Sequence, residues 1–289
     1  MKETAANYLL PVFFTPKMVA SAPNSPSAAK PPQVVADWKA KALPIQVYDP
    51  APVTAAELSL AHDPRWVAAV LACEAANGFG TRSRQVARSL PYTTGAMLSA
   101  ARYVLRHGGA ACAPSSGFHH ASFESSWGYC TFNGLMVTAA VLRQEGLVGK
   151  VGIIDCDTHP GDGTQDIISR LGAAPWVRHF TAGEEFHRPD QVPAFFERLG
   201  REMAAMADCD VVLYQAGADS HINDCGWMTT DQMRLRDALV FEGLHRRGTP
   251  VVWNLAGGYQ TEADGSIPKV LAIHENTARE CIRVFGQEG

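Results

Sequence analysis

The sequence predicts an α/β fold, a single three-layer domain with a central, mainly parallel sheet and helices on both faces. From residue 131 onward, helical patterns alternate with short β-branched runs, as in right-handed βαβ units. Clusters of titratable residues and glycine follow four predicted strands, at the sheet edge where such folds place functional groups. The chain has 289 residues, 46 % of them hydrophobic, so it can bury one large core. We therefore expect one catalytic domain over residues 1–289.

The N-terminal part is expected to hold short strands separated by helices. Residues 21–33 are rich in Ser, Pro and Ala and predict a surface loop. Thr54 and Asp63 are expected to cap two helices, the second with Pro64 in its first position. The predicted elements are strands over residues 10–14 and 44–48, helices over 54–60, from 64 onward and over 93–107, and a strand over 110–113.

The C-terminal part alternates regularly between the two kinds of element and shows no sequence repeat. The predicted helices cover residues 131–144, 164–171, 193–207, 231–246 and 267–285. The predicted strands cover residues 151–155, 176–180, 211–215 and 251–255.

Composition and charge argue against several classes of protein. A net charge of −4 argues against a non-specific nucleic-acid binder. The apolar run at residues 8–14 contains Pro11 and is too short for a signal peptide, and nothing approaches a membrane span. The seven cysteines have no C-x-x-C pair, which indicates reduced thiols. We expect a cytoplasmic protein with no nucleic-acid or membrane partner, and leave a homo-oligomer open.

Polar residues and glycines gather directly after four predicted strands. The carboxyl ends of parallel strands lie along one edge of a sheet, so these loops should converge on one crevice. The clusters are Ser-Ser-Gly-Phe-His-His (115–120), Asp-Cys-Asp-Thr-His-Pro-Gly-Asp-Gly-Thr (155–164), Ala-Gly-Ala-Asp-Ser-His (216–221) and Ala-Gly-Gly-Tyr (256–259).

Three residues of these loops have the chemistry of a metal site. Asp157, His159 and Asp219 offer one imidazole nitrogen and two carboxylate oxygens. Three protein ligands leave an open position, as hydrolytic zinc sites require, and such a metal lowers the pKa of bound water and polarises a carbonyl. We therefore expect one zinc ion per chain. The simpler interpretation is a polar strand end followed by an Asp-rich turn.

Other residues of the same loops suit proton transfer and charge stabilisation. His119 and His120 are adjacent imidazoles that can titrate near neutral pH, and Asp155 and Asp162 are candidates to fix their tautomers. Tyr259, on a Gly-Gly turn, can donate its hydroxyl to an oxyanion. Taken singly, paired histidines are often structural, and a lone tyrosine more often packs with its hydroxyl in water. We interpret three cysteines near these loops as small buried side chains that fill space: Cys130, Cys156 and Cys225.

Five motifs, in family order, resemble the histone deacetylase family of the arginase/deacetylase superfamily. They are Gly-Phe-His-His-Ala (117–121), Trp-Gly-Tyr-Cys-Thr-Phe-Asn (127–133), Asp-Cys-Asp-Thr-His-Pro-Gly-Asp-Gly-Thr-Gln (155–165), Ala-Gly-Ala-Asp-Ser-His (216–221) and Gly-Gly-Tyr (257–259). His62-Asp63-Pro64 resembles an early helix signature of the family. The resemblance spans about residues 60–260.

The resemblance implies a zinc-dependent amidohydrolase that removes acyl groups from an amine. It implies zinc binding by Asp157, His159 and Asp219, acid–base or electrostatic roles for His119 and His120 with Asp155 and Asp162 behind them, and polarisation of the scissile carbonyl by Tyr259. Gly128 and Tyr129 would line the acyl tunnel, with Phe186 as the opposing wall. The resemblance also implies a potassium ion on Asp155 and the carbonyls of Asp157 and His159.

The sequence departs from the family pattern at two places. Pro160 stands where the family usually has a second histidine, and Pro lacks an N–H and fixes φ, so the hydrogen bonding of this loop must differ. Gly117-Phe118 replaces the usual Pro-Gly, and we expect Phe118 to narrow the entrance and alter substrate choice.

Two alternatives stay open at this point. A two-manganese ureohydrolase would need more carboxylates beside Asp219, whose neighbours are Ala218 and Ser220. A catalytically inactive binding module would be expected to lack a ligand, a paired histidine or the tyrosine. Acyl-lysine, acetylpolyamines and other N-acyl amines all fit as substrates. Three acidic residues would attract a cationic substrate only if they face the mouth of the site: Glu184, Glu185 and Asp224.

Overall fold

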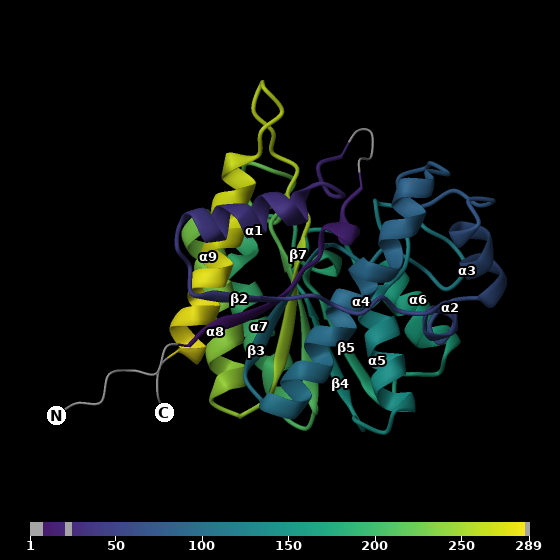
Figure 1. The fold of residues 1–289 in the computed structure, drawn as a ribbon. Helices are drawn as coiled ribbons and strands as arrows, with labels where there is room; N and C mark the ends of the chain where they lie inside the picture. Colours follow the sequence, from purple (N-terminus) through teal and green to yellow (C-terminus); the bar gives the residue numbers. More distant parts are fainter. Residues whose placement is uncertain (1–7, 21–24, 287–289) are drawn as a thin grey trace.

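The computed structural model describes residues 8–20 and 25–286 and forms one sheet of seven parallel strands with helices packed around it (Figure 1). This confirms the predicted fold class. The strands are β1 (Leu10–Phe13), β2 (Ile45–Tyr48), β3 (Ala110–Ser116), β4 (Val151–Asp155), β5 (Val177–Thr181), β6 (Val211–Gly217) and β7 (Val251–Ala256). Their order across the sheet is β2-β1-β3-β7-β6-β4-β5.

Two groups of helices cover the two faces of the sheet and bury one apolar cluster each. The first face carries α1 (Lys30–Ala40), α7 (Val192–Ala205), α8 (Thr230–His245) and α9 (Pro268–Phe285). The second face carries α2 (Ala55–Leu58), α3 (Pro64–Leu71), α4 (Arg84–His107), α5 (Gly134–Gln144) and α6 (Asp162–Arg170).

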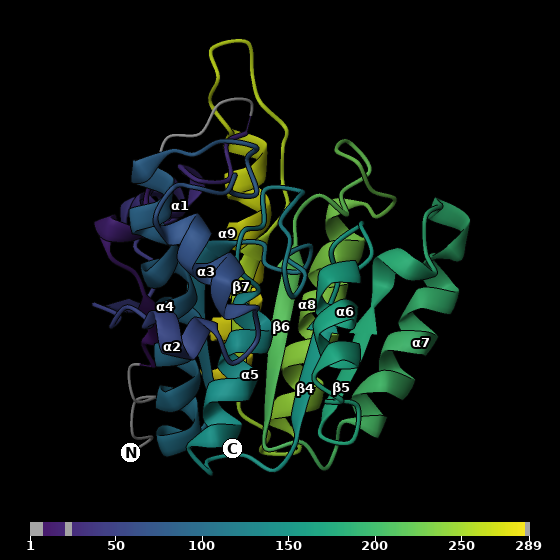
Figure 2. The ribbon, with the colours of Figure 1, turned by 90° about the vertical axis from the view of Figure 1, so that its right-hand side faces the viewer.

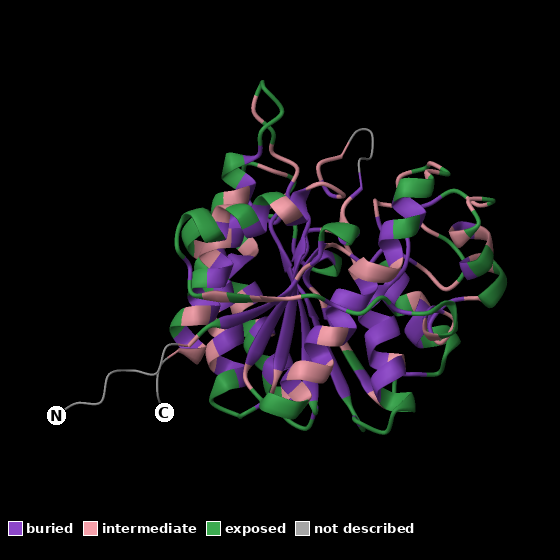
Figure 3. Cartoon of the chain, viewed as in Figure 1, coloured by how far each residue is buried: buried purple, intermediate pink, exposed green. Residues whose placement is uncertain are grey.

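The central strands are buried on both sides, which explains their continuous apolar runs. In β6, Val212 and Tyr214 pack in one cluster while Val211 and Leu213 pack in the other. In Figure 3 the central strands are coloured as buried, whereas exposed residues lie mainly on the outer sides of the helices and in the loops. Burial of this kind is the main driving force for folding a domain of this size.

The predicted caps are confirmed. Thr54 and Glu57 form a capping box at the start of α2, and the Asp63 carboxylate accepts hydrogen bonds from the backbone N–H groups of Arg65 and Trp66 at the start of α3. Asn133 caps α5 in the same way through the N–H of Met136. These short polar side chains satisfy amide groups that have no partner within a helix.

The prediction of a surface loop over residues 21–33 is wrong for residues 30–33, which are helical. Helix α1 begins at Lys30, and its first turn contains Pro31 and Pro32. Proline fits the first turn because the N–H it lacks would have no partner there. Residues 21–24 lie outside the described part of the chain. Helix α4 also begins earlier than predicted, at Arg84, where the Ser83 side chain caps it.

The strand order places four loops at one edge of the sheet. Strands β3, β7, β6 and β4 are consecutive neighbours, and the four polar clusters of the sequence follow these strands. The predicted convergence of the four loops is therefore confirmed. Figures 1 and 2 show the loop between β7 and α9 rising above this edge.

Candidate active site

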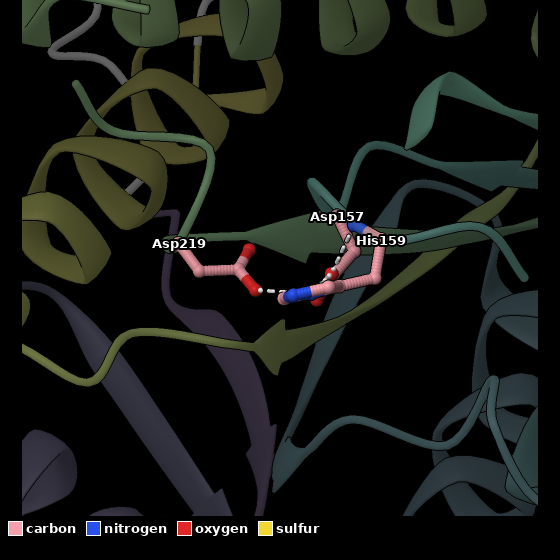
Figure 4. Close-up of side chains that lie close together, drawn as sticks. All are labelled: Asp157, His159 and Asp219. Carbon is pink, nitrogen blue, oxygen red and sulfur yellow. Dashed lines mark hydrogen bonds and ion pairs between the residues drawn. The ribbon is translucent and has the colours of Figure 1, made fainter. Parts of the chain in front are cut away.

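Asp157, His159 and Asp219 meet at the carboxyl ends of β4 and β6 (Figure 4). One ligand atom from each lies within 4.8 Å of the others. The His159 Nδ1 atom is 3.0 Å from Asp157 Oδ1 and 3.2 Å from Asp219 Oδ2. Both carboxylates are buried, whereas the His159 side chain is 41 % exposed. The two carboxylates of the cluster therefore lie in the interior, and its imidazole lies toward the solvent.

The two carboxylates are held in place by short backbone contacts. Asp157 Oδ1 accepts a hydrogen bond from the N–H of His159, and Asp219 Oδ1 accepts one from the N–H of Thr158. Burial and the neighbouring Asp157 raise the pKa of Asp219 to about 7. Close contacts of the imidazole with the Asp157 and Asp219 carboxylates raise the pKa of His159 to about 10. The cluster thus concentrates negative charge that a cation would neutralise.

The residues present fit a metal ion. Among the described residues, no donor completes a hydrogen bond to Asp219 Oδ2, although this oxygen is fully buried and faces the His159 imidazole. A buried carboxylate oxygen without a hydrogen bond is costly, and coordination of a cation would remove that cost. One nitrogen and two carboxylate oxygens are a ligand set typical of hydrolytic zinc sites.

Each of the paired histidines is bound to its own carboxylate. His119 Nδ1 lies 2.7 Å from Asp155 Oδ2, and His120 Nδ1 lies 2.7 Å from Asp162 Oδ1. The other oxygen of Asp155 accepts hydrogen bonds from the Gln215 amide and the Asp157 backbone. Such contacts place a proton of each ring on Nδ1, and they leave Nε2 of His120, which lines the cleft, for proton transfer.

The two imidazoles have different electrostatic environments although they are adjacent in sequence. Burial disfavours the charged form of His119, but the charges of Asp155 and Asp157 outweigh it and raise its pKa to about 9. Burial and the neighbouring His119 lower the pKa of His120. Environments that separate the pKa values of two neighbouring groups suit a division between a charged and a proton-accepting role.

Tyr259 enters the site on a turn that requires glycine. Gly257 has a φ of 53°, and a Cβ atom there would lie 2.2 Å from the Asp219 carboxyl carbon. The Lys30 ammonium donates to the Gly257 carbonyl, and Asp224 Oδ2 accepts from the N–H of Tyr259 at 2.7 Å. Burial, Asp157 and Asp219 raise the pKa of the Tyr259 phenol well above its usual range. Its hydroxyl therefore keeps its proton.

A cleft opens directly above these groups. His120, His159 and Tyr259 line it together with Trp127, Gly128 and Tyr129. Its lining also includes Ser25, Pro26, Cys225, Thr261 and Gly265. The Tyr129 and Tyr259 rings lie 5.7 Å apart between centroids. Gly128 has a φ of 55°, and a Cβ atom there would approach the His120 ring to 2.3 Å. The structure thus brings Gly128 and Tyr129 to the cleft.

Two predicted substrate-binding residues lie elsewhere. Phe118 is 3 % exposed and packs in the core against Gly134, so it does not narrow the entrance as expected. Phe186 is 6 % exposed and packs against Phe195 and Trp227, so it is not a wall of the cleft. In both cases the ring fills apolar space beneath its loop, which burial favours over exposure at a rim.

The charged residues considered at the mouth are engaged in other contacts. Glu185 forms an ion pair with Arg198, and both Glu184 and Glu185 line a different depression. Asp224 is not among the residues that line the cleft, and one of its oxygens accepts from the N–H groups of Tyr259 and Gln260. Cys225 lines the cleft and is exposed, so its interpretation as a buried filler is wrong.

Pro160 lies where two backbones touch. A Cβ atom at Gly183 would meet the His159 carbonyl carbon at 2.2 Å and the Pro160 nitrogen at 2.7 Å. The loop continues with the N–H of Gly161 donating to Thr181 Oγ1. The backbone nitrogen of Pro160, which carries no hydrogen, therefore lies close to the backbone of the segment that follows β5.

Three residues of the site were not predicted. Gln215, at the end of β6, donates to Asp155 and accepts from the Phe118 N–H. Lys30 reaches the Gly257 carbonyl from α1. Trp127 Nε1 donates to Asp162 Oδ2 at 3.0 Å. A polar residue at the end of an apolar strand was a signal for Gln215, whereas the surroundings of Lys30 in sequence gave none.

Comparison with known proteins places the chain in a family. A model of the histone deacetylase domain matches residues 28–177. The chain belongs to the histone deacetylase family. An uncharacterised protein of Picosynechococcus sp. is 30 % identical over 262 residues, which cover 80 % of this chain and 84 % of that protein. Acetylpolyamine amidohydrolase 2 of Pseudomonas aeruginosa is 44 % identical over 50 residues, only 14 % of its length.

Solved structures share the fold of this histone deacetylase family member. An acetylpolyamine aminohydrolase from Burkholderia pseudomallei superposes with a TM-score of 0.74 at 18 % identity, covering 95 % of this chain and 99 % of that chain. The HDA15 HD domain also gives a TM-score of 0.74, at 20 % identity, covering 98 % and 90 %. Within the described residues, none of the helices combines the length and apolar character needed to span a bilayer.

Proposed function

We propose that this protein is a zinc-dependent hydrolase that removes an acetyl or other acyl group from an amine. The observation that carries the proposal is that the ligand cluster, both histidine–aspartate pairs and Tyr259 meet below one cleft. Membership of the histone deacetylase family supports a deacetylase or amidohydrolase reaction. The metal, the residue roles and the substrate class are parts of the proposal.

Asp157, His159 and Asp219 would hold the zinc ion. Zinc supplies Lewis acidity there, which activates water as a nucleophile and polarises a carbonyl group. The charge of the two carboxylates and the buried Asp219 oxygen that accepts no hydrogen bond support this ligand set. Asp155, the residue expected to bind potassium, contacts His119, Gln215 and the Asp157 backbone through its two carboxylate oxygens.

His120 is the residue we assign to proton transfer. Its lowered pKa favours the neutral ring, and Asp162 occupies Nδ1, so Nε2 accepts a proton from the attacking water and returns it to the leaving amine. His119 has a raised pKa and lies deeper, with Nε2 3.7 Å from Asp157 Oδ1. Its positive charge stabilises negative charge that develops on the acyl group.

Tyr259 completes the site from the loop after β7, the strand between β3 and β6. Its hydroxyl keeps its proton and can donate a hydrogen bond to the acyl oxygen as negative charge develops there. The glycine turn and the contacts of Lys30 and Asp224 hold its backbone. Tyr129 and Gly128 would flank the acyl-amine chain in the cleft.

The lining of the cleft leaves the amine undecided between acyl-lysine, acetylpolyamine and other N-acyl amines. Among the described residues, the lining includes no Lys, Arg, Asp or Glu side chain. The choice of amine can be tested by measuring turnover on a panel of N-acetyl amines that differ only in the amine. The panel should compare chains of equal length that end in an ammonium group or in a methyl group. Bound zinc is quantified on the same preparations.

The outcomes of this panel also separate the alternatives. Release of acetate from any of these amines at one zinc per chain supports the proposal. Two catalytic metals per chain, with no acetate from the panel and with urea released from a guanidino compound, would support a ureohydrolase, although the described residues contain one three-ligand cluster. Full zinc occupancy with no turnover on the whole panel would support a binding module.

A further inference from the structure

Trp127 is a large aromatic side chain at an exposed position. It lies in the loop between β3 and α5, is 50 % exposed and lines the cleft. Its ring centroid is 3.9 Å from that of His120, with 40° between the ring planes. Its indole N–H donates to Asp162 Oδ2 at 3.0 Å. The same side chain therefore contacts both members of the His120–Asp162 pair.

The Asp162 carboxylate is divided between these two partners. Oδ1 is bound to His120 Nδ1 and Oδ2 to the indole of Trp127. The Asp162 side chain is 43 % exposed, unlike Asp155, which is fully buried and held by Gln215. A half-exposed carboxylate can exchange its partners for water or change rotamer. The indole N–H is the protein contact that holds its second oxygen.

The backbone around Trp127 aims the indole at this pair. The N–H of Cys130 donates to the Trp127 carbonyl at 2.9 Å, and the N–H of Tyr129 donates to the Gly78 carbonyl at 3.0 Å. Gly128 and Tyr129 both have positive φ angles, of 55° and 64°. A non-glycine residue in this conformation is held there by its surroundings at some cost in energy. The turn is therefore built to a fixed shape.

We propose that Trp127 is a positioning residue that holds Asp162, and through it His120, in the orientation needed for proton transfer. Its ring also covers one side of His120 and limits the access of water to the pair. This inference rests on the proposed hydrolase function of the same cleft. It assigns to Trp127 a role in turnover beyond that of a wall for the substrate.

Two substitutions separate the N–H from the ring. Trp127→Phe keeps an aromatic ring and removes the donor, so kcat should fall about tenfold while KM stays within about twofold, as for other residues that orient a catalytic group. Trp127→Ala removes the ring as well and should also raise KM. The matched control is Trp176→Phe. Trp176 directly precedes β5 and packs against Arg143, so this substitution should leave kcat and KM unchanged. An unchanged kcat in Trp127→Phe would overturn the inference.

A double substitution tests the route through Asp162. Asp162→Ala removes both acceptor oxygens, so adding Trp127→Phe should lower kcat no further. Independent, multiplicative losses in the double variant would contradict a role through Asp162. Thermal unfolding of each variant shows whether a loss of kcat merely reports a loss of folded protein.

A spectroscopic measurement tests the contact without any turnover. The chain has six tryptophans, so proton–nitrogen correlation spectra should contain six indole N–H signals, and Trp127→Phe identifies one of them. That signal should move in Asp162→Ala, because the acceptor is lost, while the other five stay in place. A stationary Trp127 signal would refute the inference. An inactive wild type with a moving signal would instead refute the proposed function alone.

Discussion

The floor and the wall of the cleft are held together in different ways. The floor, defined as Asp155, Asp157 and Asp219, lies within two residues of the ends of β4 and β6 and is at most 2 % exposed. The wall, defined as Trp127, Tyr129 and Tyr259, lies on the longer loops that follow β3 and β7. The sheet itself places the floor, whereas a small number of side-chain contacts places the wall.

Buried polar groups lock the backbone of the floor. Ser220 Oγ donates to the Cys156 carbonyl at 2.7 Å, and Arg236 Nη1 donates to the Gly217 carbonyl at 2.8 Å. Arg236 is fully buried and paired with Asp237. Such networks leave few alternative arrangements, because breaking one contact leaves another buried group unpaired.

One histidine outside the cleft anchors the wall. His62 is fully buried, with Nδ1 2.9 Å from the Ser122 carbonyl and Nε2 accepting from the N–H of Asn133 at 2.8 Å. These two contacts fix both ends of the segment that contains Trp127 and Tyr129. The segment between them depends on turn geometry and on the contact of Trp127 with Asp162.

The largest expected effect comes from a change in the metal-ligand cluster, in which His159 lies beside two carboxylates of the floor. His159→Ala should lose zinc and reduce turnover by several orders of magnitude, because the Lewis acid that activates water is no longer held. The fold should survive, since the side chain is 41 % exposed and packs little. Metal content, turnover and circular dichroism check these three points. Full zinc content with wild-type turnover would show that His159 is not a ligand.

Tyr259→Phe tests the wall with a smaller expected effect. The substitution removes the phenol hydroxyl but keeps the ring packed against Tyr129, so zinc content and KM should change little. Turnover should fall by roughly two to three orders of magnitude, the range for removal of one oxyanion donor. A fall of less than about fivefold would show that this hydroxyl does not reach the acyl oxygen.

The sequence predicted the residues that directly follow strands better than the phenylalanines in the loops, for a physical reason. Asp157 and His159 follow a strand directly, so strand geometry alone turns both toward one edge of the sheet. Phe118 and Phe186 lie in the loops, and their directions depend on packing against Gly134 and Trp227, which are distant in sequence. No periodic pattern encodes such contacts.

Two further residues show the same limit. Lys30 lies in a segment whose prolines fit both a loop and the first turn of a helix, and the helix was decided by burial of its apolar face. Trp127 contacts an aspartate 35 positions away in sequence. Its motif was recognised, but the role of its side chain depends on tertiary structure.

The smallest expected effect concerns the anchor of the wall and depends on pH. Burial lowers the pKa of His62 from 6.5 to about 4, so on acidification the unfolded chain binds this proton before the folded one. The stability from His62 is therefore complete above about pH 6.5 and declines as the pH falls toward 4, by roughly 3 kcal/mol in total. His62→Gln should be less stable than the wild type at pH 7, with a gap that narrows at pH 4.5. Urea unfolding at both pH values measures it, and a gap that stays constant would mean that His62 is not held neutral in the folded protein.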